Sequence, residues 1–179
     1  DIYDENLIIR PCDGGYTCWV KTKGECRIKD SANEIIQKIQ SSYLTLYAFP
    51  LYINSIPAKL KALLDRMFAI RRPVFVPCGG LTRNALWALE ERYSALFSVC
   101  GFPDIEYFKP VVDVFENTGK SFHQPLIASI LRPGAEFFIT SPPYRNYLDK
   151  ITRSLDEAGK ELVEKGRISG TLLESVSSY

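Results

Sequence analysis

Two short apolar runs constrain the fold of this chain more than any other part of its sequence. They are YLTLYAF at residues 43–49 and YSALFSV at residues 93–99, and each breaks at a turn, the first at Pro50 and the second at CGFP. Runs that are apolar throughout are typical of strands buried on both faces, and such strands belong to parallel sheets. Because parallel strands need a long crossover, usually a helix, we expect helices around both runs.

Three segments have the apolar spacing of amphipathic helices. Residues 31–42 begin with Ser31 and Glu34 in a Ser-x-x-Glu capping box, and a second pattern has Pro57 in its first turn. The third runs from about Tyr144 to Lys165 and ends before Gly166. The three apolar stripes are Ala32, Ile35, Ile36 and Ile39; Leu60, Leu63, Leu64, Met67 and Phe68; and Tyr147, Leu148, Ile151, Leu155, Ala158 and Leu162.

The other segments give weaker signals. A fourth helix is expected in DIEYFKPVVDVFENTG, where Pro110 marks either a kink or the true start and Gly119 closes the pattern. PLIASILRPG is a third strand candidate. Residues 71–92 are irregular at first and then helical or extended, so their structure is left open.

Alternating strands and helices predict an α/β fold, a three-layer doubly wound parallel sheet, as one domain over residues 1–179. Such sheets bind ligands in loops just past the carboxyl ends of their strands. The loops PLYINSIP and CGFPDIEYF meet that description, so we expect a site there.

The composition excludes several classes of partner. The 22 basic and 21 acidic residues nearly cancel and form no long run of one sign, so neither a nucleic acid nor an anionic membrane is an expected partner. No apolar run is long enough to span a membrane, and no signal peptide is recognisable, so we expect a cytoplasmic location. There the five cysteines would stay reduced.

Several motifs together resemble a known family. PLYINSIPAKLKALLDR resembles the P-x-Y-x-x-S-x-P-x-x-L-K segment of the NAD(P)H-dependent FMN reductases, which have a flavodoxin-like fold. The pattern CxxxxxCWxKTxGxCxIKD lies ahead of it, and CGFP and LRPGAEFF follow it. In this order the four pieces are similar to the branch of the family that includes the iron–sulfur flavoproteins.

The resemblance implies an FMN site made of two loops. The flavin ring would lie against backbone amides, and a flat ring also suits apolar walls and small residues such as Gly. The reaction implied is hydride transfer from NAD(P)H to flavin, then electron delivery to a quinone, a nitro compound, free flavin or a redox partner. No acid–base residue is required, so no catalytic residue is assigned. The matching cofactor-binding positions are Pro50, Leu51, Tyr52, Ile53, Asn54, Ser55, Cys100, Gly101 and Phe102.

The chain also departs from this family. The family begins with a strand, a Gly/Ser/Asn-rich loop that wraps the FMN phosphate, and a helix, whereas DIYDENLIIRPC resembles the tail of the second strand. We therefore expect an N-terminally incomplete sheet, an open apolar edge on the 43–49 strand, and weak FMN binding unless another polypeptide or a swapped segment supplies the missing piece. An exposed edge and the family's habit both favour a homodimer or larger assembly.

The cysteine-rich stretch CDGGYTCWVKTKGEC could hold metal, act in redox chemistry or only pack. The iron–sulfur branch uses four closely spaced cysteines, but Gly15 stands at the second position. Cys12, Cys18 and Cys26 could still ligate a cluster or zinc with a fourth ligand such as Cys78. The alternative, an inherited loop without metal, is favoured, so an iron–sulfur cluster is not expected.

Plainer interpretations stay open elsewhere. PLYINSIP could be an ordinary strand-to-helix turn, Tyr52 could pack in a core, and Cys100 could be a small buried residue at a strand end. Lys61, Asp65 and Arg66 fit a solvated or dimer-facing helix surface. The alternative to an enzyme is a truncated or degenerate flavodoxin-like module, without catalysis, that serves dimerisation or partner binding.

Overall fold

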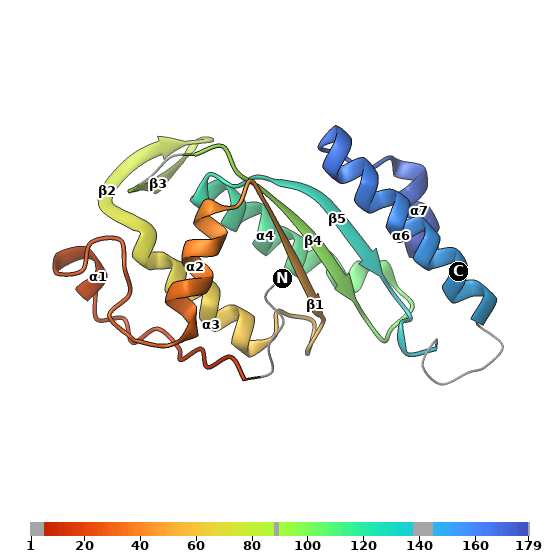
Figure 1. Ribbon diagram of the computed structural model, residues 1–179, viewed down its shortest axis with the longest axis horizontal. Helices are drawn as coiled ribbons and strands as arrows, with labels where there is room; N and C mark the ends of the chain where they lie inside the picture. The colour runs from red at the N-terminus through yellow and green to blue at the C-terminus, as the bar shows by residue number, and fades with distance from the viewer. Residues whose placement is uncertain (1–5, 88–89, 138–144, 179) are drawn as a thin grey trace.

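A three-stranded parallel sheet forms the centre of the computed structural model, which describes residues 6–87, 90–137 and 145–178 (Figure 1). Its strands are β1 (Leu44–Pro50), β4 (Tyr93–Val99) and β5 (Leu126–Arg132), in the order β1-β4-β5. All three strands predicted from the sequence are therefore confirmed. The helices are α1 (Thr17–Val20), α2 (Ser31–Ser41), α3 (Ala58–Arg66), α4 (Lys109–Phe122), α6 (Arg145–Lys165) and α7 (Gly170–Ser177), with short 3-10 helices η1 (Met67–Ile70) and η2 (Ile105–Phe108).

Helices cover both faces of the sheet, as expected for a doubly wound α/β fold. The larger core joins α2, α3 and α4 to one face, where Tyr47, Phe49 and Leu96 are buried. A smaller cluster on the other face joins Ala95 and Ala128 to Leu162 of α6. Figure 1 shows α2 and α3 on one side of β1, and α6 with α7 beyond β5.

The expectation that residues 43–49 are buried on both faces is wrong. β1 is the last strand of the sheet, and its side chains alternate between buried Tyr47 and Phe49 and exposed positions. Leu46 is 52% exposed because α7 packs beside β5 and no described helix covers β1 on that face. Within the residues that the structure describes, the strand thus has the open, apolar edge that was also expected.

The capping residue of α2 differs from the prediction. Asp30, not Ser31, is the N-cap, and its Oδ1 accepts a hydrogen bond of 3.0 Å from the amide of Ala32. Ser31 is the first helical residue, and its hydroxyl instead accepts a bond from the amide of Ile8. The four predicted apolar positions of α2 are all buried.

Gly119 does not end α4, contrary to the sequence interpretation. The helix continues to Phe122 and is capped by His123, which adopts a left-handed conformation. Gly119 is required for another reason: a Cβ there would lie 2.6 Å from the carbonyl oxygen of Gln124. Pro110 lies in the first turn and therefore marks the start of the helix rather than a kink.

Residues 71–86, which were left open, form a β-hairpin. Strands β2 (Arg71–Cys78) and β3 (Leu81–Leu86) pair antiparallel through a turn at Gly79 and Gly80, which both have positive φ angles. At the other end of the chain, α6 ends before Gly166 as predicted. No helix in the described ranges is long and apolar enough to cross a membrane.

Candidate flavin site

A tight turn follows β1 at the carboxyl end of the sheet. The amide of Leu51 donates to the carbonyl of Val99 at 2.9 Å, which ties the turn to β4. Tyr52 and Ser55 then exchange two backbone hydrogen bonds of 3.1 Å each. Between them, Ile53 and Asn54 have φ angles of 49° and 56°. A left-handed conformation is common for Asn but strained for a β-branched residue, so Ile53 is held there by the turn around it.

The tip of this turn is presented to solvent. Tyr52 is 61% exposed and Ile53 is 96% exposed, although both are large apolar side chains. Their exposure rules out the alternative that Tyr52 packs in the core. Strain and exposure together at a strand end are typical of a binding position rather than of a plain connection.

The loop after β4 lies beside the loop after β5. The amide of Cys100 donates to the carbonyl of Arg132 at 3.0 Å, and the amides of Ala135 and Gly134 donate to the carbonyls of Cys100 and Phe102 at 2.8 and 2.7 Å. Cys100 itself is buried, so it supports the loop rather than facing a ligand. These bonds fix the backbone of Gly101.

Gly101 lies close to the side chain of Glu136. A Cβ at this position would lie 2.9 Å from the carboxylate carbon of Glu136. Glu136 follows β5 in the LRPGAEFF motif, so a third loop contributes to the site. The sequence had not marked Glu136 as a site residue, although the motif containing it had been noted.

Aromatic residues join the two flavin loops, which we define as residues 50–55 and 100–102. Phe102 stacks on Tyr107 of η2 with ring centroids 4.8 Å apart and an interplanar angle of 23°. Tyr107 also lines a hollow with Asn54, Glu106 and Pro110, so η2 lies between the loops. Sequence reasoning missed Tyr107, although it stands only five positions after Phe102.

The flavin loops offer unused backbone donors. Within the described residues the amides of Ile53, Asn54 and Gly101 make no hydrogen bond. Free N–H groups beside exposed aromatic and apolar side chains suit a flat ring with a polar edge. The residues present therefore fit the isoalloxazine ring of FMN.

The same loops do not suit a phosphate. Glu106 lines the hollow beside Asn54, and the carboxylate of Glu136 lies beside Gly101, so two acidic side chains border the loops. A phosphate prefers clustered N–H donors and cations. The fit to FMN is thus confined to its ring.

The cysteine loop, residues 12–26, is organised around a buried arginine instead. Arg66 is fully buried at the end of α3, and its Nε donates to the sulfur of Cys26 at 2.9 Å. Its two terminal nitrogens donate to the Asp30 carboxylate at 3.0 and 3.1 Å and to the carbonyls of Arg10 and Ile28 at 3.0 and 2.9 Å. The prediction that Arg66 belongs to a solvated helix surface is therefore wrong, because Arg66 is the only cation of α3 that is buried. Lys61 and Asp65 form an exposed ion pair, as expected.

Electrostatics in this region follow from that network. Burial alone would raise the pKa of Asp30, but hydrogen bonds from Arg66 and from the amides of Arg10 and Ala32 hold it below its ordinary value. Burial raises the pKa of the Cys18 thiol, and the nearby thiols of Cys26 and Cys12 raise it further. A protonated thiol is a poor metal ligand.

The three cysteines differ in exposure. Cys12 is exposed, Cys18 is half-buried and Cys26 is buried. Within the ranges that the structure describes, no group of three His, Cys, Asp or Glu side chains could hold a metal ion. Cys78 lies on the hairpin, where its sulfur is 3.9 Å from the carbonyl of Lys120. Through Arg66, both Cys26 of the cysteine loop and Asp30, the N-cap of α2, are thus hydrogen-bonded to α3.

Comparisons with known proteins agree with this geometry. An iron–sulfur flavoprotein of Methanosarcina thermophila is 30% identical over 100 residues, which cover 56% of this chain and 45% of that protein. An iron–sulfur flavoprotein of Methanocaldococcus jannaschii is 33% identical over 63 residues, 35% of this chain and 32% of that protein. The matched regions therefore span less than half the length of either relative.

A solved structure shares the fold. A quinone reductase candidate from Klebsiella pneumoniae superposes with a TM-score of 0.61 at 12% identity, over 90% of this chain and 67% of that one. The family of NADPH-dependent FMN reductases matches residues 4–108, which include the cysteine loop, α2, α3 and both flavin loops. The match covers more than half of the sequence, and the chain therefore belongs to the NADPH-dependent FMN reductase family.

Proposed function

We propose that this chain binds the isoalloxazine ring of FMN between its flavin loops and works as an FMN-dependent NAD(P)H oxidoreductase. The observation that carries the proposal is the strained, exposed turn after β1, where the amides of Ile53 and Asn54 make no hydrogen bond within the described residues. Asn54 lines a hollow with Tyr107, on which Phe102 of the other loop stacks. Family membership supports the same reaction class.

The residues would divide the work of holding the ring. The amides of Ile53, Asn54 and Gly101 would donate to its polar edge, while the side chains of Tyr52 and Phe102 would cover its apolar part. When bound, FMN supplies the hydride chemistry between NAD(P)H and the acceptor. The protein therefore needs to orient the ring and exclude water, not to supply an acid or a base.

The acceptor, the assembly and the location are part of the same proposal. A quinone, a nitro compound, free flavin or a redox partner could accept the electrons, and the name of the Klebsiella structural relative is consistent with a quinone. A homodimer would bury the exposed side chains of the flavin loops. We place the protein in the cytoplasm, where its free cysteines would stay reduced.

FMN titration of the full chain tests the proposal. The change in flavin absorbance and fluorescence should report binding weaker than about 1 μM, because within the described residues no cationic phosphate cradle accompanies the flavin loops. Phe102→Ala should weaken binding roughly tenfold through loss of ring contact. Val163→Ala is the matched control, since Val163 is an apolar side chain 80% exposed on α6.

Two results would count against this proposal. Equal FMN affinity of Phe102→Ala and the wild type would remove the flavin loops as the site. A purified monomer that carries stoichiometric yellow flavin would overturn the weak-binding expectation.

The second candidate function is a non-catalytic module that serves dimerisation or partner binding. The carboxylates of Glu106 and Glu136 beside the flavin loops favour it, because they oppose an anionic cofactor. NADPH oxidation by the FMN-saturated chain separates the candidates: turnover supports the enzyme, and binding without turnover supports the module.

A further inference from the structure

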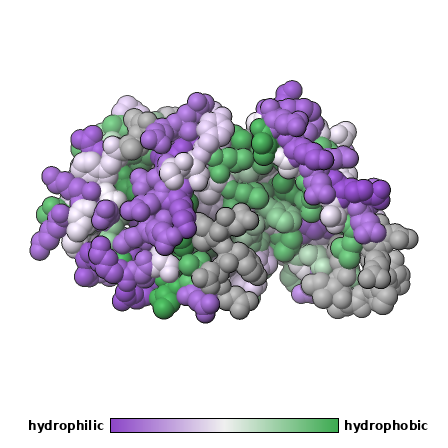
Figure 2. All heavy atoms as spheres, viewed as in Figure 1, coloured by the Kyte–Doolittle hydropathy of each residue, from purple (hydrophilic) through white to green (hydrophobic). Residues whose placement is uncertain are grey.

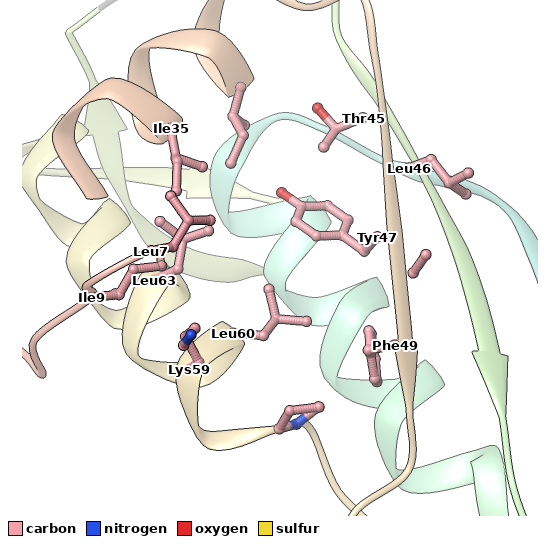
Figure 3. Close-up of a pocket in the computed structure, with 13 residues that line it drawn as sticks. Leu7, Ile9, Ile35, Thr45, Leu46, Tyr47, Phe49, Lys59, Leu60 and Leu63 are labelled. Carbon is pink, nitrogen blue, oxygen red and sulfur yellow. The ribbon is translucent and has the colours of Figure 1, made fainter. Parts of the chain in front are cut away.

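Apolar residues gather beside the sheet on the face of the molecule that Figure 2 shows, in the hollow between α6 and the main body. Figure 3 shows Leu7, Tyr47 and Leu63 around an apolar groove along β1, and Lys59 is the only charged residue among those that line this groove. A second cavity borders another face of α3, and its lining has a different chemistry.

This second cavity has a volume of about 220 Å³ and lies between α3 and α4. Its charged lining residues are Lys61 and Asp65 of α3 and Arg71 at the start of β2. Thr118 of α4 adds a hydroxyl group to the lining. We call it the Arg71 cavity.

The Arg71 cavity lies away from the flavin loops. The turn after β1 leads into the start of α3, whereas Arg71 follows the far end of that helix, after η1. Thr118 lies about 13 Å along α4 from Lys109, at about 1.5 Å per residue. In Figure 1 the hairpin of β2 and β3 accordingly lies at the opposite end of α3 from the turn after β1. A small ligand in this cavity would therefore occupy a site of its own.

Arg71 is a half-buried cation without an acidic partner. Its Nε is buried and makes no hydrogen bond, and its guanidinium forms no ion pair within the described residues. Asp65 is the acidic residue that lines the cavity, but its carboxylate is paired with Nζ of Lys61 at 2.5 Å. Because a buried charge without a partner is costly, an anion that supplied acceptors would stabilise the folded protein here.

A second arginine without a partner lies nearby, on β3. The Nε of Arg83 is also buried without a hydrogen bond, and Arg83 has no ion pair in the ranges that the structure describes. Burial and the positive charge of Arg83 together lower the pKa of Arg71. The two guanidinium groups thus repel each other, and a bound anion would offset that repulsion.

Aromatic rings hold the Arg71 side chain in place. Its guanidinium carbon lies 4.2 Å from the ring centroid of Phe122 and 6.0 Å from that of Phe68. Both of these residues line the cavity. Cation–π contacts use the face of the guanidinium and leave its N–H groups free to donate. An arginine held in this way presents a fork of donors that matches the oxygens of a phosphate or a carboxylate.

Charge and size together favour a small phosphate over other anions. Three cations, at Lys61, Arg71 and Arg83, face one carboxylate in and beside the cavity, which leaves a net charge of +2 among these residues. A phosphate monoester has a charge of about −1.5 to −2 at pH 7, so it balances that charge better than a carboxylate does. Drug-sized ligands occupy cavities of about 300–1,000 Å³. A cavity of about 220 Å³ suits a phosphate with at most a small attached group.

We propose that the Arg71 cavity binds a small phosphate-class anion, either free phosphate or a small phosphate monoester. Arg71 and the hydroxyl of Thr118 donate hydrogen bonds to its oxygens, and Arg83 adds favourable charge from beside the cavity. The site shares no residue with the flavin loops, so the proposal does not depend on flavin binding.

Calorimetric titration of the full chain with sodium phosphate, at constant ionic strength, tests the proposal. The dissociation constant should be about 1 mM or lower, since two or three charge-assisted hydrogen bonds form. Arg71→Met should weaken binding at least about tenfold. Arg72→Met is the matched control, because Arg72 is the next residue on β2, is exposed over the Trp87 ring and does not line the cavity. The same loss of charge there should change the affinity by less than about twofold.

A second variant and a second ligand sharpen the test. Thr118→Val keeps every cation and should weaken phosphate binding severalfold, so it decides the matter even where Arg71→Met fails to fold. Glycerol 3-phosphate separates the two sources of the anion. Tighter binding than that of free phosphate would identify a phosphate monoester as the ligand, and equal or weaker binding would identify the free anion.

Three results would overturn the proposal. The first is no binding of phosphate or glycerol 3-phosphate at up to about 10 mM. The second is a loss of affinity in Arg72→Met equal to that in Arg71→Met, or an unchanged affinity in Thr118→Val, since either would indicate general attraction of anions to a basic surface. The third is acetate binding as tight as phosphate binding, which would make a carboxylate the ligand.

Discussion

The cysteine loop and the flavin loops both carry sequence motifs of the family, yet they use their polar groups in opposite ways. In the cysteine loop, buried Arg66 donates to Cys26, to Asp30 and to two carbonyls. In the flavin loops, amides at Ile53 and Gly101 have no partner within the described residues. Internally satisfied polar groups hold the scaffold together, and unsatisfied, exposed ones are available to a ligand.

The difference also separates two kinds of motif. The cysteine pattern indicates ancestry, because its buried member, Cys26, is fixed to α3 by Arg66 and contributes to packing. The PLYINSIP pattern belongs to the proposed flavin site, because its turn exposes strained and apolar residues at a strand end. A motif therefore has to be judged by whether its polar groups are already occupied.

The largest expected effect comes from breaking the cysteine-loop network. Arg66→Met should lower the free energy of unfolding by about 3–5 kcal/mol, because it leaves the Asp30 carboxylate, only 3% exposed, without its buried partner. Urea unfolding followed by circular dichroism measures the change. The matched control is Lys61→Met on the same helix, where loss of the exposed pair with Asp65 should cost at most about 1 kcal/mol.

Equal effects of the two substitutions would contradict this view of α3. A small loss in Arg66→Met would mean that Met packs well enough to replace the network, and the cysteine loop would then be held mainly by apolar contacts. A large loss in both would place Lys61 in the scaffold as well.

Sequence patterns predicted the regular elements well because these depend on local apolar spacing. The strand at residues 93–99 and the end of α6 before Gly166 lie where the patterns indicated. The capping of α2 was misassigned by one residue, because Asp30 and Ser31 are both good caps and only the contact of Asp30 with Arg66 distinguishes them.

Long-range contacts explain what the sequence could not predict. Arg66 is 36 positions from Asp30. No local sequence pattern predicts that Arg66 is buried while Asp65, the residue before it, is exposed. Similarly, Gly101 lies beside Glu136, which comes from the segment after β5. The flavin loops were located from strand ends, but their neighbours Tyr107 and Glu136 required the fold. Their assignment to FMN stays a prediction.

A second prediction concerns the charge within the same network. Asp30→Asn keeps a good helix cap but removes the carboxylate, so at pH 7 it should cost about 1.5–3 kcal/mol. The folded-state pKa of Asp30 lies below its ordinary value, so its stabilising contribution is complete above pH about 4 and is lost as the pH falls through the folded value. The difference between wild type and Asp30→Asn should therefore shrink below pH 4.

Urea unfolding of both proteins between pH 7 and pH 3 measures this difference. A gap that stays constant with pH would show that geometry, not charge, makes Asp30 important. Asp65→Asn, on the exposed face of α3, is the control and should show little difference from the wild type at either pH.

The smallest expected effect has the opposite sign and lies in the flavin loops. Ile53→Asn should raise the free energy of unfolding by about 0.5–1 kcal/mol, because Asn tolerates the left-handed conformation and Ile53, 96% exposed, loses almost no buried area. The same change should weaken FMN binding severalfold, since an apolar contact at the turn is lost. Together these two results would mean that the left-handed conformation of Ile53, which costs stability in the free chain, serves FMN binding.

Thermal unfolding and FMN titration of the same sample measure both effects. The control is Ile105→Asn, because Ile105 is an exposed Ile in η2 with an ordinary conformation. A loss of stability in Ile53→Asn would mean that Ile53 contributes to packing. The flavin loops would then not differ from the cysteine loop in the way argued above.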